Sequence, residues 1–195
     1  MRLIRVLIFV FLASWAAAAQ AQIEIAFYSK DMASSFPHAY VRFTGTDEQT
    51  GQPVDTNYGF TPVSLSPGIL FGNVRGMMET ASPIYVARSD RHFALNLTDA
   101  QYRQVLAIVE QWRNAKQPSY NLNKRNCITF VAEIATALGL QAPVLPKLMK
   151  KPKSYLNAIT EMNSVAISQW PGGPGLLTAP PAQAPVQSTG TATAH

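Results

Sequence analysis

Cys127 is the single cysteine of this 195-residue chain, and it stands at the head of the apolar run Asn126-Cys127-Ile128-Thr129-Phe130-Val131. In an oxidising compartment a lone thiol has no intramolecular disulfide partner, so it is either a small buried residue or a group held for chemistry. At a helix N-terminus the thiol would face unpaired amides and the positive end of the helix dipole, which lower its pKa. Both interpretations of Cys127 stay open: a nucleophile for acyl transfer and a core residue.

A thiol nucleophile needs a base, and the chain has three histidines, of which His195 is the last residue of a Pro/Ala/Thr-rich tail. His38, at the start of a predicted strand, is the preferred base, whereas His92 has no motif around it. A third polar group usually orients the imidazole. The next strand supplies Asn57 and Asp55 on one face, and we choose Asn57 narrowly.

The residue before the cysteine has its own predicted role. Asn126 and the local backbone amides could donate hydrogen bonds to an oxyanion that forms beside the sulfur. One cysteine and two ordered histidines without paired spacing do not make a zinc site, so we predict neither a metal nor a cofactor.

The elements that must position these residues follow from periodicity and turn chemistry. Alternating or β-branched runs predict strands at 23–28, 39–44 and 53–60, with a turn at 45–52, and further extended pieces at 69–71, 74–78, 84–87 and 92–97. Thr98 and Gln101 form a capping-box pattern for a helix that ends near Asn114. A second helix is predicted from Cys127 to Leu138, closed by Gly139. The expected fold class is α+β, a small antiparallel sheet packed against helices.

Composition divides the chain into three parts. Arg2 and Arg5 precede an apolar stretch that ends in Ala19-Gln20-Ala21, which predicts a signal peptide over 1–21 and an exported, periplasmic or secreted, protein, although the stretch could persist as an uncleaved anchor. Residues 22–170 have the size of one domain. Residues 171–195 are rich in Pro, Gly, Ala and Thr and predict a disordered tail.

Removal of Arg2 and Arg5 leaves 14 basic against 11 acidic residues, a net charge of +3. This modest charge, together with export, argues against nucleic acid as a partner. Four lysines follow the cysteine helix closely and either contact an anionic envelope surface or form an ordinary solvated loop: Lys147, Lys150, Lys151 and Lys153.

The order of these motifs resembles a known family. The chain resembles the circularly permuted papain-like thiol hydrolases in the order of four segments. These are Pro37-His38-Ala39-Tyr40-Val41-Arg42-Phe43, Tyr58-Gly59-Phe60, Tyr120-Asn121-Leu122 and the Asn126-Cys127 helix start. These include permuted relatives of the NlpC-type cell-wall peptidases and the lecithin:retinol acyltransferase-like proteins. The resemblance spans about Phe36 to Leu140. It implies a papain-like fold with the histidine strand before the cysteine helix, Cys127 as nucleophile and His38 as general base.

We therefore expect an exported thiol hydrolase that cleaves an amide, most plausibly in peptidoglycan peptides, through a thioester on Cys127. An acyltransferase or lipid hydrolase with the same dyad is an alternative, and the segment Ile69 to Met78 could line its apolar groove. A third hypothesis is a non-catalytic envelope protein that binds cell-wall or lipid fragments on the same scaffold. An inert, buried Cys127 would favour that third hypothesis.

Overall fold

The computed structural model describes residues 23–31, 36–116 and 118–171. The predicted signal peptide at 1–21 lies outside these residues, as does the predicted tail at 171–195 apart from Pro171. Nearly all of the predicted domain at 22–170 is described.

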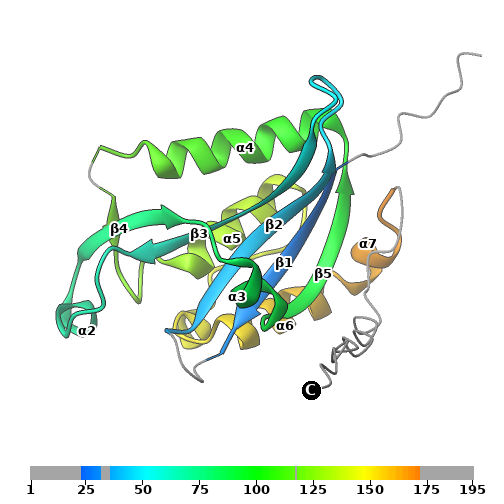
Figure 1. Ribbon diagram of the computed structural model, residues 1–195. Coiled ribbons are helices and arrows are strands. Elements are labelled where there is room, and N and C mark those ends of the chain that lie inside the picture. The colour runs from blue at the N-terminus through cyan, green and yellow to red at the C-terminus, as the bar shows by residue number, and fades with distance from the viewer. Residues whose placement is uncertain (1–22, 32–35, 117, 172–195) are drawn as a thin grey trace, which may run out of the picture.

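The described chain forms one antiparallel sheet with helices on its two faces (Figure 1). The strands are β1 (Ile23–Lys30), β2 (His38–Thr46), β3 (Pro53–Pro62), β4 (Val74–Glu79), β5 (Asp90–Leu97) and β6 (Ser119–Tyr120). The helices are α2 (Gly68–Phe71), α3 (Pro83–Ala87), α4 (Asp99–Arg113), α5 (Cys127–Ala137), α6 (Pro152–Met162) and α7 (Ser164–Ser168), with a 3₁₀ turn η1 (Pro146–Leu148). The strand order is β5-β1-β2-β3-β4-β6. The predicted α+β class, a small antiparallel sheet packed against helices, is confirmed.

The two faces of the sheet differ in what covers them. On the inner face, alternate residues of β2 such as Ala39, Val41 and Phe43 are fully buried in the main core, which α4, α5 and α6 complete. On the outer face, Tyr28 and Tyr40 stack in a smaller cluster that the short helix α3 covers. Figure 1 shows α5 behind the sheet and α3 in front of it. The period of two along β2 therefore sends neighbouring residues into different environments.

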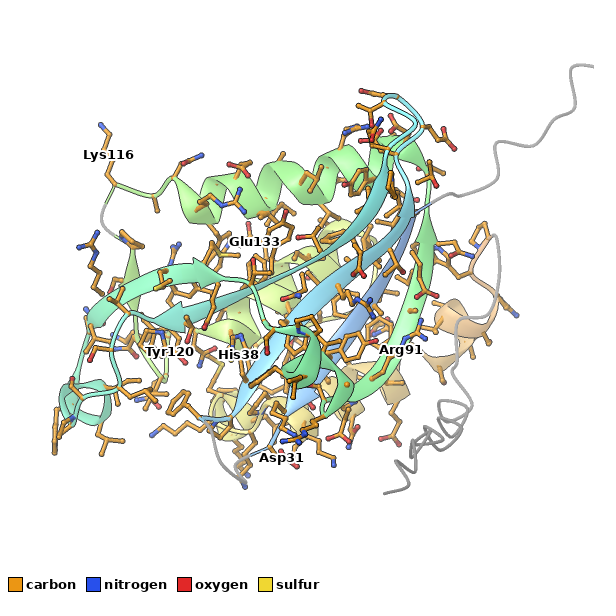
Figure 2. The ribbon with its side chains drawn as sticks, in the orientation of Figure 1. Asp31, His38, Arg91, Lys116, Tyr120 and Glu133 are labelled. Atoms are coloured by element: carbon orange, nitrogen blue, oxygen red, sulfur yellow. The ribbon has the colours of Figure 1, made fainter. Side chains whose placement is uncertain are left out.

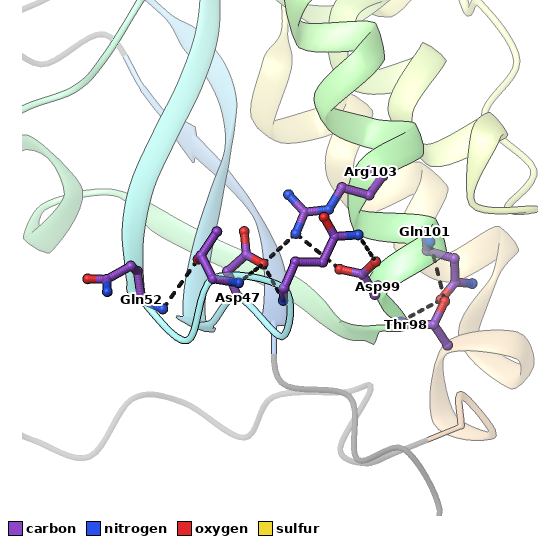
Figure 3. Close-up of polar contacts among 8 residues, drawn as sticks. Asp47, Gln52, Thr98, Asp99, Gln101 and Arg103 are labelled. Atoms are coloured by element: carbon purple, nitrogen blue, oxygen red, sulfur yellow. Dashed lines mark hydrogen bonds and ion pairs between the residues drawn. The ribbon is translucent and has the colours of Figure 1, made fainter.

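The β2–β3 hairpin is anchored to α4 at its turn (Figure 3). The Asp47 carboxylate accepts hydrogen bonds from the backbone of Gln49 and Thr50 and forms an ion pair with Arg103. Arg103 also pairs with Asp99, 3.2 Å away on the preceding turn of α4. These contacts hold the far end of the hairpin against the helix that follows β5.

The predicted start of α4 is confirmed. The Thr98 hydroxyl accepts from the Gln101 amide at 3.3 Å, and the Gln101 side chain accepts from the Thr98 amide at 3.0 Å, which completes the capping box. Tyr102, Val105 and Val109 face the core, as their helical spacing predicts.

Two predicted extended segments are wrong. Residues 69–71 lie in α2 and residues 84–87 lie in α3, and both are short helices. At α3 the Ser82 hydroxyl accepts from the Tyr85 amide, and Pro83 occupies the first helical position, where its missing N–H costs nothing. One turn of helix carries too few residues to show its period, so local apolar content resembles a strand.

Candidate active site

Asn126 sets the start of α5 and so fixes the position of Cys127. Its side-chain oxygen accepts from the amides of Ile128 at 2.8 Å and Thr129 at 3.3 Å. The Thr129 hydroxyl accepts in turn from the Asn126 amide at 2.9 Å, which completes a second capping box. The predicted helix start at Cys127 is confirmed, and Gly139 has the positive φ of 86° expected just past the helix end.

The Asn126 side chain, which the sequence offered as an oxyanion donor, has other partners in the fold. Its amide nitrogen donates to the carbonyl oxygens of Leu122 at 2.8 Å and Met149 at 2.7 Å, and the residue is 1% exposed. Both amide hydrogens are therefore used within the fold. Asn126 ties the α5 start to the segment after α5, and no donor of this side chain remains for a reacting oxygen.

Substitution of Asn126 tests this structural role. Asn126→Ala removes the helix cap and strands two buried carbonyls, so we expect a loss of about 2 kcal/mol in the free energy of unfolding. Urea denaturation measures it. Asn126→Asp keeps the cap acceptor but turns a carboxylate oxygen toward the two carbonyl oxygens in a buried site, so it should not restore the stability. Asn123→Ala, at an exposed turn position, is the control, and equal losses for the two alanine variants would refute the account.

The Cys127 thiol is buried against the start of β2. The side chain is 3% exposed, and burial raises its pKa to about 11. The backbone N–H groups of Ala39, Ile128 and Cys127 itself oppose this rise, as does the Tyr120 hydroxyl. The sulfur is thus surrounded by donors that favour the thiolate, but the lost hydration outweighs them. At neutral pH the thiol keeps its proton.

His38 begins β2 on the outer face of the sheet (Figure 2). Its ring stacks on that of Tyr40, with centroids 6.0 Å apart and planes 18° apart. Its Nε2 atom lies over Gly59, only 2.2 Å from the point where a Cβ of residue 59 would stand. Burial lowers the His38 pKa to about 4. The imidazole is therefore neutral at pH 7 and has a lone pair to accept a proton.

Near His38 and Cys127, strand β3 stops pairing with β2 and begins to pair with β4. The pairing of β2 with β3 ends at Val41 opposite Tyr58, and β3 then pairs with β4, where Gly59 lies opposite Glu79. Cys127 reaches the backbone N–H of Ala39 from the inner face, and this N–H belongs to the peptide bond that follows His38. The thiol and the imidazole thus lie on opposite faces of the sheet, near the point where β2 and β3 separate. Among the described residues no hydrogen bond joins the two side chains.

A glycine at position 59 is required for this arrangement of His38. We expect Gly59→Ala to displace the imidazole and to destabilise the fold by about 1–3 kcal/mol, as overpacking does. The NMR signals of the His38 ring and urea denaturation report the two effects. Gly72→Ala is the matched control, because a Cβ there meets nothing within 4 Å. Unchanged His38 ring signals in Gly59→Ala would contradict the close approach.

The residues proposed to orient His38 have other partners. The Asn57 amide donates to the Ala81 carbonyl at 3.0 Å and accepts from the Ala81 amide. Asp55 lies on the same strand and forms a two-pronged ion pair with Arg42, with both contacts at 2.9 Å. In the described part of the chain neither side chain bonds to His38. The geometry gives no support to either choice for the third position.

His92, the alternative base, lies in a different polar cluster. Its Nε2 atom is 2.7 Å from the Ser29 hydroxyl, which is fully buried, and the side chain of Asn157 also bonds to it. Burial is the largest cause of its lowered pKa. The Cys127 thiol contacts the residue after His38, whereas His92 is held by Ser29 and Asn157, so His38 remains the better candidate.

A pocket of about 480 Å³ opens on the outer face beside His38. Aromatic rings and small polar groups line it, and Lys and Arg are absent from its lining among the described residues. The lining residues are Phe36, His38, Tyr40, Asn57, Gly59, Thr61, Pro62, Val63, Leu65, Glu79, Thr80, Ala81, Ser82 and Tyr85. Cys127 is outside this set. Sequence reasoning missed Glu79 and Tyr85, because nothing local marks them as near His38.

The four lysines after α5 differ in their exposure and in their ion pairs. Lys147, Lys150 and Lys151 are exposed, whereas Lys153 lies 3.1 Å from Asp90 and 3.5 Å from Asp31. Three of them are thus open to a partner. The described residues include no helix long and apolar enough to cross a membrane and no cluster of three or more His, Cys, Asp or Glu side chains arranged to hold a metal.

Comparison of the chain with protein-family models, with curated proteins and with solved structures finds no match.

Proposed function

We propose that this protein is an exported thiol hydrolase that cleaves an amide bond, with Cys127 as nucleophile and His38 as general base. One observation carries the proposal: the cysteine helix packs against the histidine strand where β2 and β3 separate, although Cys127 and His38 are 89 positions apart in sequence. The sulfur contacts the peptide bond that follows His38. A nucleophile at a helix start beside a histidine strand is the arrangement that thiol acyl transfer requires.

The protonation states define how the reaction begins. With a thiol pKa of about 11 and an imidazole pKa of about 4, both groups are neutral between these values. Because the two groups lie on opposite faces of the sheet, the mechanism requires the His38 ring to turn toward the sulfur at the point where β2 and β3 separate. The S–H proton then passes to an imidazole nitrogen as the sulfur attacks the carbonyl carbon, so His38 acts as a true base rather than as half of a preformed ion pair. The rate should therefore rise with pH through about 4 and then stay level through neutral pH.

The backbone replaces Asn126 as the source of oxyanion stabilisation. The N–H groups of Cys127 and Ala39 lie close to the sulfur, whereas that of Ile128 already donates to the Asn126 side-chain oxygen. Amides held by a helix start and a strand need no reorganisation when negative charge develops on the attacked carbonyl. Collapse of the tetrahedral intermediate breaks the C–N bond, and His38 returns the proton to the leaving amine. Water then releases the acyl group from the thioester and restores the thiol.

The pocket supports a peptide as the substrate. Its volume lies within the usual range for small-molecule sites, and its aromatic and hydroxyl-bearing walls suit a mostly neutral chain. Its lack of basic side chains within the described lining disfavours phosphorylated substrates. The choice of peptidoglycan stem peptides therefore rests on the predicted export, because the carboxylates of these peptides would meet no Lys or Arg within the described lining.

Incubation of the folded protein with isolated peptidoglycan fragments tests the proposal. We expect mass spectrometry to detect new peptide products that Cys127→Ala and His38→Ala both fail to form. Intact fragments in the presence of the wild-type protein would argue against this substrate.

A second candidate is a non-catalytic binding protein that uses the pocket alone. It is favoured by one observation: Cys127 is 3% exposed and stands outside the pocket lining. In that case fragments would bind but remain uncleaved, and His38→Ala would change affinity only. No residue of 69–78 lines this pocket, so the pocket itself does not contain the apolar groove suggested for the lipid alternative.

A further inference from the structure

We infer that Glu79 is the residue that orients His38 and stabilises its protonated form. The inference rests on the proposed function for its catalytic meaning. Asn57 and Asp55, the residues first proposed for this role, lie on β3 together with Gly59. Glu79 lies on β4, the next strand of the sheet.

The register of the sheet places Glu79 opposite Gly59, the glycine over which the imidazole lies. Glu79 lies opposite Gly59 in the β3–β4 pair, and the two residues of such a pair project to the same face with Cβ positions about 4.5–5.5 Å apart. His38 Nε2 occupies the space that a side chain at Gly59 would fill. The imidazole nitrogen therefore occupies the space of the side chain that Gly59, the cross-strand partner of Glu79, lacks. A glutamate side chain is long enough to reach it across the missing side chain.

Both residues also line the same pocket, which places them on one continuous surface. Within the described chain, Glu79 is the only carboxylate of that lining. Asp55 is bound to Arg42, and the Asn57 amide is used by Ala81. No other acidic side chain of the lining competes for the histidine.

The other titratable groups near His38 are neutral or positive. They come from each element packed around it: Lys30 opposite it in β1, Tyr40 on β2, Tyr85 on α3 and Cys127 reaching the His38–Ala39 peptide from α5. The Lys30 amine donates to the Arg88 carbonyl. Glu79 is thus the group that can offset the positive charge on the ring.

The role follows from the reaction. When the imidazole takes the thiol proton it becomes a cation in a poorly hydrated place, and a nearby carboxylate lowers the free energy of that state. A carboxylate beside Nε2 also holds the Nε2–H tautomer, which leaves Nδ1 as the base. Glu79 gains and loses no proton in the cycle, so it is a positioning residue.

The tautomer of His38 gives the direct test. Long-range ¹H–¹⁵N NMR spectra of the folded full chain at pH 7 should show a single Nε2–H tautomer in the wild type. Glu79→Ala should shift the ring nitrogens toward a mixture, and Glu79→Asp should restore part of the difference. Glu161→Ala, an exposed carboxylate on α6, is the matched control and should change nothing. Identical His38 nitrogen shifts in wild type and Glu79→Ala would overturn the inference.

Kinetics add a second measurement. We expect Glu79→Gln to lower kcat about 10- to 100-fold, as a misplaced base does, and to move the acid limb of the pH profile to lower pH. A kcat that Glu79→Gln leaves unchanged would overturn the inference. If the wild type proves inactive while Glu79→Ala still alters the His38 tautomer, the positioning role stands and the proposed hydrolase function fails.

Discussion

Replacement of Cys127 by alanine is expected to reduce hydrolysis of peptidoglycan fragments by at least about 10³-fold, because no second thiol exists to form the thioester. The substitution removes one sulfur atom from a packed site, so the fold should persist with a small loss of stability. Steady-state rates and the circular dichroism spectrum, measured on the same samples, separate the two effects. Cys127→Ser keeps the size of the side chain but has a weaker nucleophile, and it should be nearly as inactive.

His92→Gln is the matched control for this experiment. His92 bonds to Ser29 and Asn157, away from the proposed dyad, so its substitution should leave the rate close to that of the wild type. If His92→Gln lost as much activity as Cys127→Ala while His38→Gln kept it, the assignment of the base would be wrong.

Acidification is expected to destabilise the protein through His38. The unfolded histidine has a pKa near 6.5 and the folded one a pKa of about 4, so the unfolded state binds a proton first as the pH falls. Stability is unaffected above pH 6.5, declines below it, and reaches its full loss below pH 4. Between pH 7 and pH 4.5 the loss amounts to up to about 2.5 kcal/mol.

Urea denaturation at the two pH values measures this loss. His38→Gln cannot titrate, so it should show a smaller decline than the wild type. The pKa of His92 is also lowered by burial, so part of the decline remains in that variant and falls further in His38→Gln/His92→Gln. An identical decline in wild type and His38→Gln would mean that His38 is not buried in its neutral form.

The sequence alone supported the elements whose signals are local and repeated. The capping box at Thr98 is a short pattern with a physical cause, and α4 begins where it predicts. The α5 helix also begins at Cys127 as predicted, although the cap that Asn126 provides there was not foreseen. The β2–β3 hairpin likewise follows from its alternation and its polar turn. In contrast, α2 and α3 are single turns of helix, and their apolar residues have no distinguishable period.

The site was harder to predict because its geometry depends on register and long-range contacts. Asn126 looked free to act on a substrate, but its partners Leu122 and Met149 can be identified only once the segment after α5 has folded back. Asn57 lies on the same face of the sheet as His38, yet its side-chain amide forms both of its hydrogen bonds with the backbone of Ala81, 24 positions later. Glu79 becomes a candidate only when the pairing of β3 with β4 is known.

Acylation of Cys127 in the folded protein tests the central claim most directly. The folded protein is incubated at pH 7 with para-nitrophenyl acetate, a small activated ester, and peptide mapping by mass spectrometry locates the acetyl group. We predict an acetyl thioester on Cys127 that forms in the wild type, forms more slowly in His38→Ala and is released by hydroxylamine. Acetylation of Cys127 only after unfolding in urea would show that the sulfur is an inert part of the core, and it would contradict the proposed mechanism.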